Sequence, residues 1–270
     1  REAESLDITF QTDNSHLRPR VATAHVARRG SALRMQDESG ASVLCREALY
    51  DGVRKPVGNV MTVDLGDVKN WYIGQTISRT RAALERNGFE SFITQTKQEA
   101  LQKALSMIPV EAIVGVGGSV TIREIGLIQA LNERGNTVVQ HWNVALSESQ
   151  LRTVLKQELN SDVFLCSANA VTEDGKLVNM DGTGNRVASM IFGPKKVIVV
   201  AGRNKIVKDL DEALERVKTI AAPMNSKRMN NENNPCTKTG VCTDCDSESR
   251  ICKVTTIIER RPTLTDFSVI

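Results

Sequence analysis

Aromatic residues and long apolar runs are scarce in this chain of 270 residues. Aromatic side chains make up 4% of the sequence, so aliphatic side chains must fill any core, and a hydrophobic content of 40% allows one of ordinary size. No apolar run approaches the roughly 18–20 residues that span a bilayer. Residues 1–4 are charged and show no apolar signal core. We therefore expect a cytoplasmic protein without a membrane-spanning segment.

An excess of charge of one sign is also missing. Lysine and arginine number 35 against 32 acidic residues, which gives a net charge of +3. The sequence has no basic stripe interleaved with aromatic residues, so it does not predict a nucleic-acid partner. Histidine occurs three times, and only His141 lies beyond the first sixty residues. His141 stands at a predicted strand end, where a rim or structural role is favoured over that of a base.

Residues 1–60 differ from the rest of the chain. They are polar and rich in turn residues, and no helical or strand period persists among them. This composition predicts a poorly ordered N-terminal extension. Residues 61–270 are predicted to form one α/β domain, which includes a cysteine-rich loop at 235–253.

Apolar strands and amphipathic helices alternate along 61–270. Buried strands are predicted at 112–116, 163–166 and 196–200, and helices at 67–87 and 209–220. Three further helices are predicted to start at capping boxes, which are Thr96 with Glu99, Thr121 with Glu124, and Ser147 with Gln150. Asp174-Gly175 between two short apolar runs predicts a hairpin. The alternation predicts a Rossmann-like fold with a mainly parallel sheet flanked by helices.

A glycine loop follows the strand at 112–116. Glycines let the backbone turn sharply and approach a ligand, and the next helix would direct free N–H groups at an anion. We predict that this loop binds a small anionic ligand through Gly115, Gly117, Gly118, Ser119 and Thr121. The loop matches neither a P-loop nor the dinucleotide fingerprint. The alternative is a tight strand-to-helix turn in which glycine is needed only for steric reasons.

A second polar loop is predicted at the same edge of the sheet, because ligands in open α/β sheets lie beyond the carboxyl ends of the strands. Asp181 and Glu173 are the catalytic candidates, although Asp181 could equally cap the following helix. Lys205 follows the next strand and is predicted either to reach an anion or to remain a surface charge. The predicted ligand-binding residues of this second loop are Gly182, Thr183, Gly184 and Asn185.

Four cysteines are clustered near the C-terminus. Cys236, Cys242, Cys245 and Cys252 have the spacing Cys-x5-Cys-x2-Cys-x6-Cys among residues typical of loops. Four thiolates in one irregular loop are typical of an iron–sulfur site. Structural zinc is the alternative, although it commonly uses two Cys-x-x-Cys pairs and only one is present. Disulfides or free thiols are the third reading. A [4Fe–4S] cluster is the favoured prediction.

Residues 61–270 resemble the LUD-domain family of lactate-utilisation proteins. The resemblance is carried by the segments 115–135, 167–175, 179–187 and 192–202 and by the cysteine segment. It implies a fold like that of ribose-5-phosphate isomerase, glucosamine-6-phosphate deaminase and the CoA transferases. It also implies a link to the oxidation of L-lactate to pyruvate, in which related subunits work as iron–sulfur complexes.

The favoured hypothesis is therefore a redox-associated iron–sulfur subunit that binds a small organic acid or a phosphorylated ligand. A redox protein partner and homo-oligomerisation are compatible with it. One alternative is an isomerase or transferase that acts on a sugar phosphate or an acyl-CoA and carries structural zinc. The other is a non-enzymatic module that senses a metabolite.

Overall fold

The computed structural model describes residues 34–36, 42–44, 64–142 and 145–270, in two compact units, Arg1–Thr62 and Val63–Ile270. In the first unit, the strands β1 (Arg34–Gln36) and β2 (Ser42–Leu44) pair antiparallel. Most of the predicted N-terminal extension lies outside the described residues, so its disorder remains a prediction. The second unit contains the two larger sheets.

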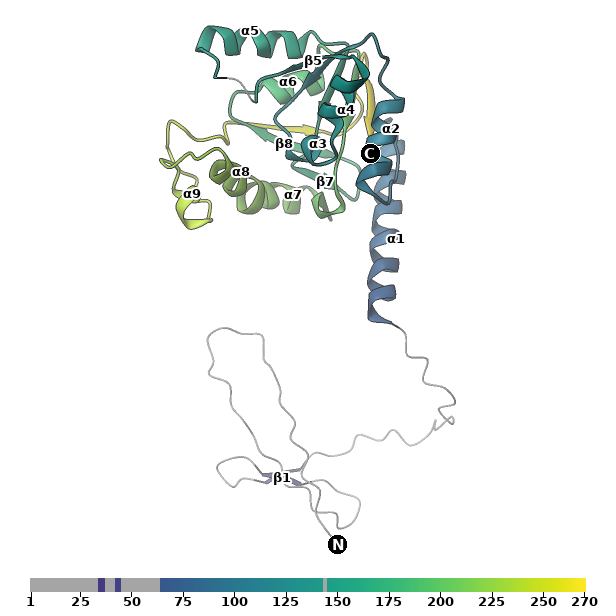
Figure 1. Cartoon of the computed structure of the whole chain (residues 1–270). Coiled ribbons are helices and arrows are strands. Elements are labelled where there is room, and N and C mark those ends of the chain that lie inside the picture. Colours follow the sequence, from purple (N-terminus) through teal and green to yellow (C-terminus); the bar gives the residue numbers. More distant parts are fainter. Residues whose placement is uncertain (1–33, 37–41, 45–63, 143–144) are drawn as a thin grey trace. The chain divides into compact units, whose positions relative to one another are not determined.

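A six-stranded sheet forms the centre of the second unit (Figure 1). All of its pairings are parallel, and its strand order is β3-β12-β9-β6-β4-β5. This arrangement confirms the predicted α/β class. The strands are β3 (Glu90–Ser91), β4 (Ile113–Val116), β5 (Thr137–Gln140), β6 (Val163–Cys166), β9 (Lys196–Val199) and β12 (Asp266–Val269).

The predicted hairpin is present but belongs to a second sheet. Gly175 adopts a φ of 86° at its turn, a conformation that glycine takes without steric cost. The four-stranded sheet has the order β10-β7-β8-β11. Its strands are β7 (Ala170–Thr172), β8 (Leu177–Asp181), β10 (Ile206–Val207) and β11 (Val254–Ile258).

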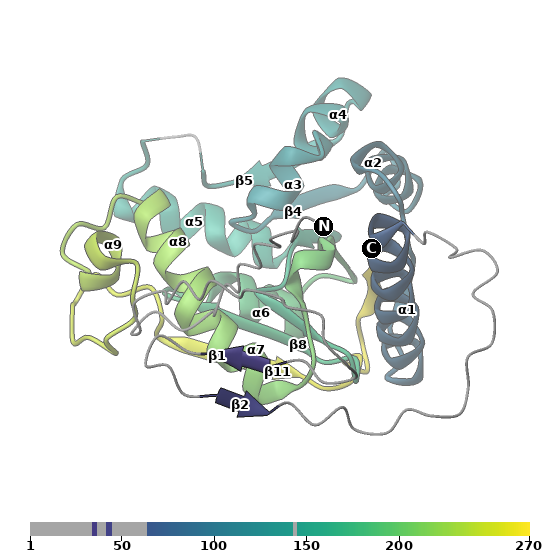
Figure 2. The same cartoon turned by 90° about the horizontal axis from the view of Figure 1, so that it is seen from below.

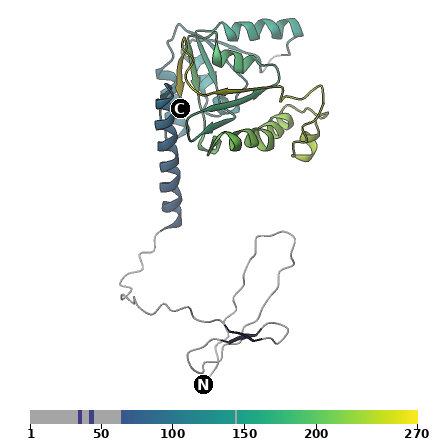
Figure 3. The ribbon, with the colours of Figure 1, turned by 180° about the vertical axis from the view of Figure 1, so that it is seen from behind.

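Helices connect and cover the two sheets, as Figures 1 and 3 show from opposite sides. None formed by the described residues combines the length and apolarity needed to cross a membrane. The α-helices are α1 (Leu65–Arg86), α2 (Lys97–Ser106), α3 (Val120–Glu124), α4 (Leu127–Arg134), α5 (Glu148–Leu159), α6 (Asn185–Ile191), α7 (Leu210–Arg216), α8 (Ala222–Arg228) and α9 (Pro235–Thr239). A 3-10 turn spans Arg203–Lys205, and a π-helical turn, Val217–Ala221, joins α7 to α8.

The central sheet is buried on both faces. Successive side chains of its strands point to opposite faces, and each face packs into its own apolar cluster. On one face, β4, β6 and β9 pack against α2, α3 and α4. On the other face, β6, β9 and β12 pack against α1, α6 and the second sheet. The far side of the second sheet is covered by α7. Figure 2 shows α3 and α4 on one side of β4, and α6 and α7 on the other.

The predicted helix start at Thr121 is wrong. Ser119 caps α3 by accepting a hydrogen bond from the backbone N–H of Ile122, and Gly126, with a φ of 74°, breaks the helix before α4. Ser119 takes the capping role because it stands one turn before Ile122, the buried anchor of α3. The capping box at Ser147 is confirmed, and Thr96 caps α2 as predicted.

Candidate functional site

An open cleft of about 1550 Å³ lies where the parallel strands of the central sheet end. Its floor is formed by the segments that follow β4, β6 and β9, and its sides by α1, α7, α8 and the loop after β8. The carboxyl ends of parallel strands are where open α/β sheets place their ligands. The two predicted loops therefore meet in one cleft, as the topology led us to expect.

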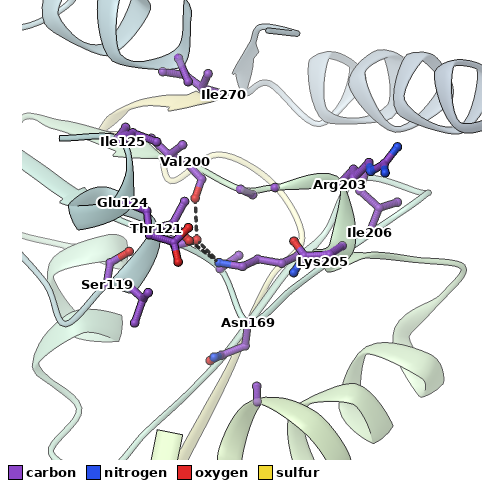
Figure 4. Close-up of a pocket in the computed structure, with 18 of the residues that line it drawn as sticks. Ser119, Thr121, Glu124, Ile125, Asn169, Val200, Arg203, Lys205, Ile206 and Ile270 are labelled. Atoms are coloured by element: carbon purple, nitrogen blue, oxygen red, sulfur yellow. Dashed lines mark hydrogen bonds between the residues drawn. The ribbon is translucent and has the colours of Figure 1, made fainter. Parts of the chain in front are cut away.

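Lys205 carries an amine in this cleft (Figure 4). Its Nζ donates hydrogen bonds to Thr121 Oγ1 at 3.0 Å and to Ser167 Oγ at 2.5 Å. Ser167 Oγ in turn donates to the carbonyl of Val200 at 2.5 Å. Burial of the amine, reinforced by the nearby positive charges of Arg216 and Arg186, lowers the pKa of Lys205 to about 8. A fraction of this side chain is thus uncharged near neutral pH.

Arg186 and Asp181 form a nearly buried ion pair beside Lys205, with side-chain exposures of 11% and 9%. The Arg186 guanidinium donates to Asp181 Oδ1 at 2.8 Å, and also to Asn169 Oδ1 and the Met180 carbonyl. The second oxygen of Asp181 accepts the backbone N–H of Val187 at 3.0 Å. The pair therefore ties α6 to β8 and fixes one wall of the cleft. The alternative reading of Asp181, as a helix-capping carboxylate, matches these contacts.

Positive charge dominates the cleft. Two carboxylates line it, Glu124 and Asp181, and each is paired with a cation. Six cationic side chains line it: Lys97, Arg186, Arg203, Lys205, Arg216 and Arg228. Such a surplus in a concave site attracts anions. No local motif marked Arg216 or Arg228, because both belong to helices that reach the cleft only through the tertiary fold.

Trp142, at the edge of the cleft, packs against Arg123 and Arg228, and of these two arginines only Arg228 lines the cleft. The guanidinium carbons of Arg123 and Arg228 lie 4.3 and 4.2 Å from the centroid of its ring. Stacking on an aromatic face holds guanidinium groups in place.

The first glycine loop is more tightly packed than an open anion cradle. A Cβ atom on Gly115 would lie 2.6 Å from Ser161 Oγ, and one on Gly117 would lie 2.9 Å from the ring of Phe164. A Cβ on Gly118 would meet the Trp142 indole at 2.8 Å. Glycine is thus needed here for packing. Gly118, Ser119 and Thr121 line the cleft, whereas Gly115 lies within β4.

The second loop places most of its predicted residues at the cleft. Gly182, Thr183 and Asn185 line it, and Gly184 adopts a φ of 85° immediately before α6. Glu173 does not line the cleft; it accepts a hydrogen bond from Arg79 at 3.0 Å on the outer surface of the hairpin.

Two further titratable residues lie near the strand ends. His141 lines the cleft, and its Nδ1 is 2.7 Å from Oε1 of Glu158, a carboxylate that is 1% exposed. Glu158 comes from α5, and no sequence signal linked it to His141. Cys166 is fully buried at the end of β6, and burial raises the pKa of its thiol to about 12. Cys166 is therefore unsuited to act as a thiolate nucleophile near neutral pH.

The four C-terminal cysteines lie in and after α9, all partly exposed and none in a disulfide. Arg250 braces the segment by donating to the Cys245 carbonyl at 2.6 Å and to Asp244 Oδ1 at 3.0 Å. Soft thiolates suit iron–sulfur clusters and zinc. Among the described residues, however, no three His, Cys, Asp or Glu side chains are grouped closely enough to hold a metal ion. The four thiols are suitable ligands for an iron–sulfur cluster or zinc, but in this structure they do not lie close enough together to form the site.

Comparison with known proteins gives one family. No curated protein matches the chain. Among solved structures, the crystal structure of a DUF162 family protein from Deinococcus radiodurans is similar to it, with 14% sequence identity and a TM-score of 0.41 over 73% of this chain and 97% of that one. The model of the LUD domain matches residues 77–270, well over half of the sequence. The chain therefore belongs to the LUD domain family, which is associated with lactate utilisation.

Proposed function

We propose that this LUD domain binds a small anionic metabolite, an organic acid or a phosphorylated compound, in the cleft around Lys205, and that it does so in lactate utilisation. The observation that carries the proposal is the surplus of cationic side chains that converge on one concave site at the strand ends. The ammonium form of Lys205 and the guanidinium of Arg216 supply charge-assisted hydrogen bonds, which are about twice as strong as neutral ones.

The test is a calorimetric titration of the purified full chain with L-lactate, pyruvate, inorganic phosphate, ribose 5-phosphate and coenzyme A. At least one of these ligands is expected to bind. The Lys205→Met variant should bind it about 10- to 100-fold more weakly, because a hydrogen bond to a charged group contributes roughly 1.5–3 kcal/mol. Lys195→Met is the matched control, since its side chain is 86% exposed and outside the cleft.

Two results would count against the proposal. One is the absence of binding by every ligand of the panel. The other is equal affinity in the native chain and in the Lys205→Met variant. Preference within the panel separates the two substrate classes: tight binding of ribose 5-phosphate or coenzyme A favours an isomerase or transferase, and binding of lactate or pyruvate favours the organic-acid reading.

The redox part of the proposal concerns the cysteine segment. We propose that Cys236, Cys242, Cys245 and Cys252 hold a [4Fe–4S] cluster, supported by four unpaired thiols within one short segment. Binding would require the segment to close, because the thiols are not grouped in the described structure. Iron, acid-labile sulfide and visible absorbance in protein purified without oxygen are the expected result. Zinc without sulfide would make the segment a structural clip, and a metal-free colourless protein would refute both.

A further inference from the structure

The nitrogen of Lys205 has two hydrogen-bond partners among the described residues, and both are hydroxyl oxygens. A neutral amine has two N–H groups and one lone pair, and the hydroxyls of Thr121 and Ser167 can accept both N–H groups. Ser167 cannot donate to the nitrogen in return, because its own proton is engaged by the carbonyl of Val200. The lone pair is therefore not capped by Ser167, and the side chain lines the cleft.

The surroundings of Lys205 raise the fraction of neutral amine above that of an ordinary lysine. Burial disfavours the ammonium, and two guanidinium groups, on Arg216 and Arg186, add repulsion. A lysine that is desolvated or placed next to another cation is the form that serves as a nucleophile toward carbonyl compounds. An amine needed only to attract anions would gain nothing from this depression of its pKa, since it binds anions through its charge.

Arg216 also limits which class of carbonyl compound could react with Lys205. Arg216 donates its Nε and one terminal nitrogen to the carbonyls of Asn204 and Asn169. Its other terminal nitrogen has no partner among the described residues, and Arg216 lines the cleft beside Lys205. A carboxylate held there would place an adjacent carbonyl group near the amine. The smallest compounds that combine the two groups are 2-oxo carboxylates.

We propose that Lys205 forms a covalent imine with a small 2-oxo carboxylate bound in this cleft. The nitrogen lone pair attacks the carbonyl carbon, and the carbonyl oxygen takes up a proton from the nitrogen, which gives a carbinolamine. The C–O bond then breaks, the oxygen leaves as water with the second amine proton, and a C=N bond remains. The step needs no oxidant or reductant. It rests on the proposed function, because it requires anion binding in the same cleft.

The test traps the imine in the full chain. Pyruvate and sodium cyanoborohydride are added near pH 7, and the modified lysine is located by peptide mass spectrometry. A pKa of about 8 gives Lys205 roughly a few hundredfold more neutral amine than an ordinary lysine at that pH. Since nucleophilicity falls with pKa, we expect labelling of Lys205 to exceed that of exposed lysines such as Lys195 by about tenfold or more.

The matched variant is Lys205→Arg, which keeps the positive charge but has no nucleophilic amine. It should form no adduct at this position, and circular dichroism should show a native fold. If lactate and pyruvate bind to the native chain but Lys205 is labelled no faster than Lys195, the imine proposal is overturned while anion binding stands. If neither compound binds and no adduct forms at Lys205, both proposals fall.

Discussion

Replacing Asp181 with alanine is expected to lower the free energy of unfolding by about 3–5 kcal/mol, because removal of one partner of a buried ion pair leaves the other charge uncompensated. Arg186 would keep its hydrogen bonds to Asn169 and to backbone carbonyls, but its charge would remain nearly buried without a counterion. The free N–H of Val187 at the start of α6 would also lose its acceptor. Chemical denaturation near pH 7 measures the loss.

The control for Asp181→Ala is the removal of an ion pair on the surface. Glu173 pairs with Arg79 at 3.0 Å, and their side chains are 29% and 52% exposed. Glu173→Ala should cost at most about 1 kcal/mol, since solvent screens such pairs. Asp181→Asn should fall between the two alanine variants, because it keeps the shape but loses the charge. Equal losses in Asp181→Ala and Glu173→Ala would show that the buried pair does not fix the wall of the cleft.

The second large effect is expected for Gly175→Ala. Gly175 has a φ of 86°, and a Cβ atom would lie 2.6 Å from the carbonyl carbon of Ala83 and 2.7 Å from the backbone nitrogen of Leu84. These atoms belong to the backbone of α1 and cannot move aside cheaply. The left-handed conformation costs an alanine roughly 1–2 kcal/mol, and overpacking adds roughly 1–3 kcal/mol. We expect a total loss of about 2–5 kcal/mol.

Gly135→Ala provides the control for Gly175→Ala. Gly135 closes α4 with a φ of 91°, yet a Cβ atom there would meet nothing within 4 Å. This variant should show only the conformational cost of about 1–2 kcal/mol. Thermal and chemical denaturation measure the loss of stability in both variants. The difference between the two losses is the cost of the steric contact between the Cβ added at position 175 and α1. If both lose the same stability, the contact between the hairpin and α1 has no measurable part in the fold.

Local patterns predicted much of the fold. The buried runs around Val114, Phe164 and Ile198 are the central strands of the parallel sheet, because apolar runs of this length can be covered on both faces only there. The turn at Asp174-Gly175 was also readable from the sequence. Its strands join a second sheet with β10 and β11, and no periodicity identifies such distant partners.

The site was less predictable than the fold. The glycine loops marked the correct edge of the sheet, but the side chains that give the cleft its charge come from separate segments. Lys205 was recognised as either an anion ligand or a surface charge, and only the tertiary structure places it beside Ser167 and Thr121. Arg216 and Glu158 carry no sequence signal at all, because helical spacing alone does not reveal which side chains turn toward a cleft.

The charge state of Lys205 should make anion binding in the cleft depend on pH. The ionisable groups near enough to affect its pKa are Arg216, Arg186, Cys166 and Glu124. The thiol of Cys166, with a pKa of about 12, stays neutral. The charge of Lys205 itself changes near pH 8. The side chain is largely an ammonium below that pH and a neutral amine above it.

The most direct measurement is the affinity for L-lactate as a function of pH. L-lactate has no ketone group, so it cannot form an imine with Lys205. Between about pH 7 and pH 9.5, the affinity of the native chain should fall roughly tenfold or more, because Lys205 loses its charge near pH 8. Lys205→Arg and Lys205→Met should show no such fall. A native profile that is flat across this range, or that the Lys205→Met variant reproduces, would contradict the role of Lys205 in anion binding.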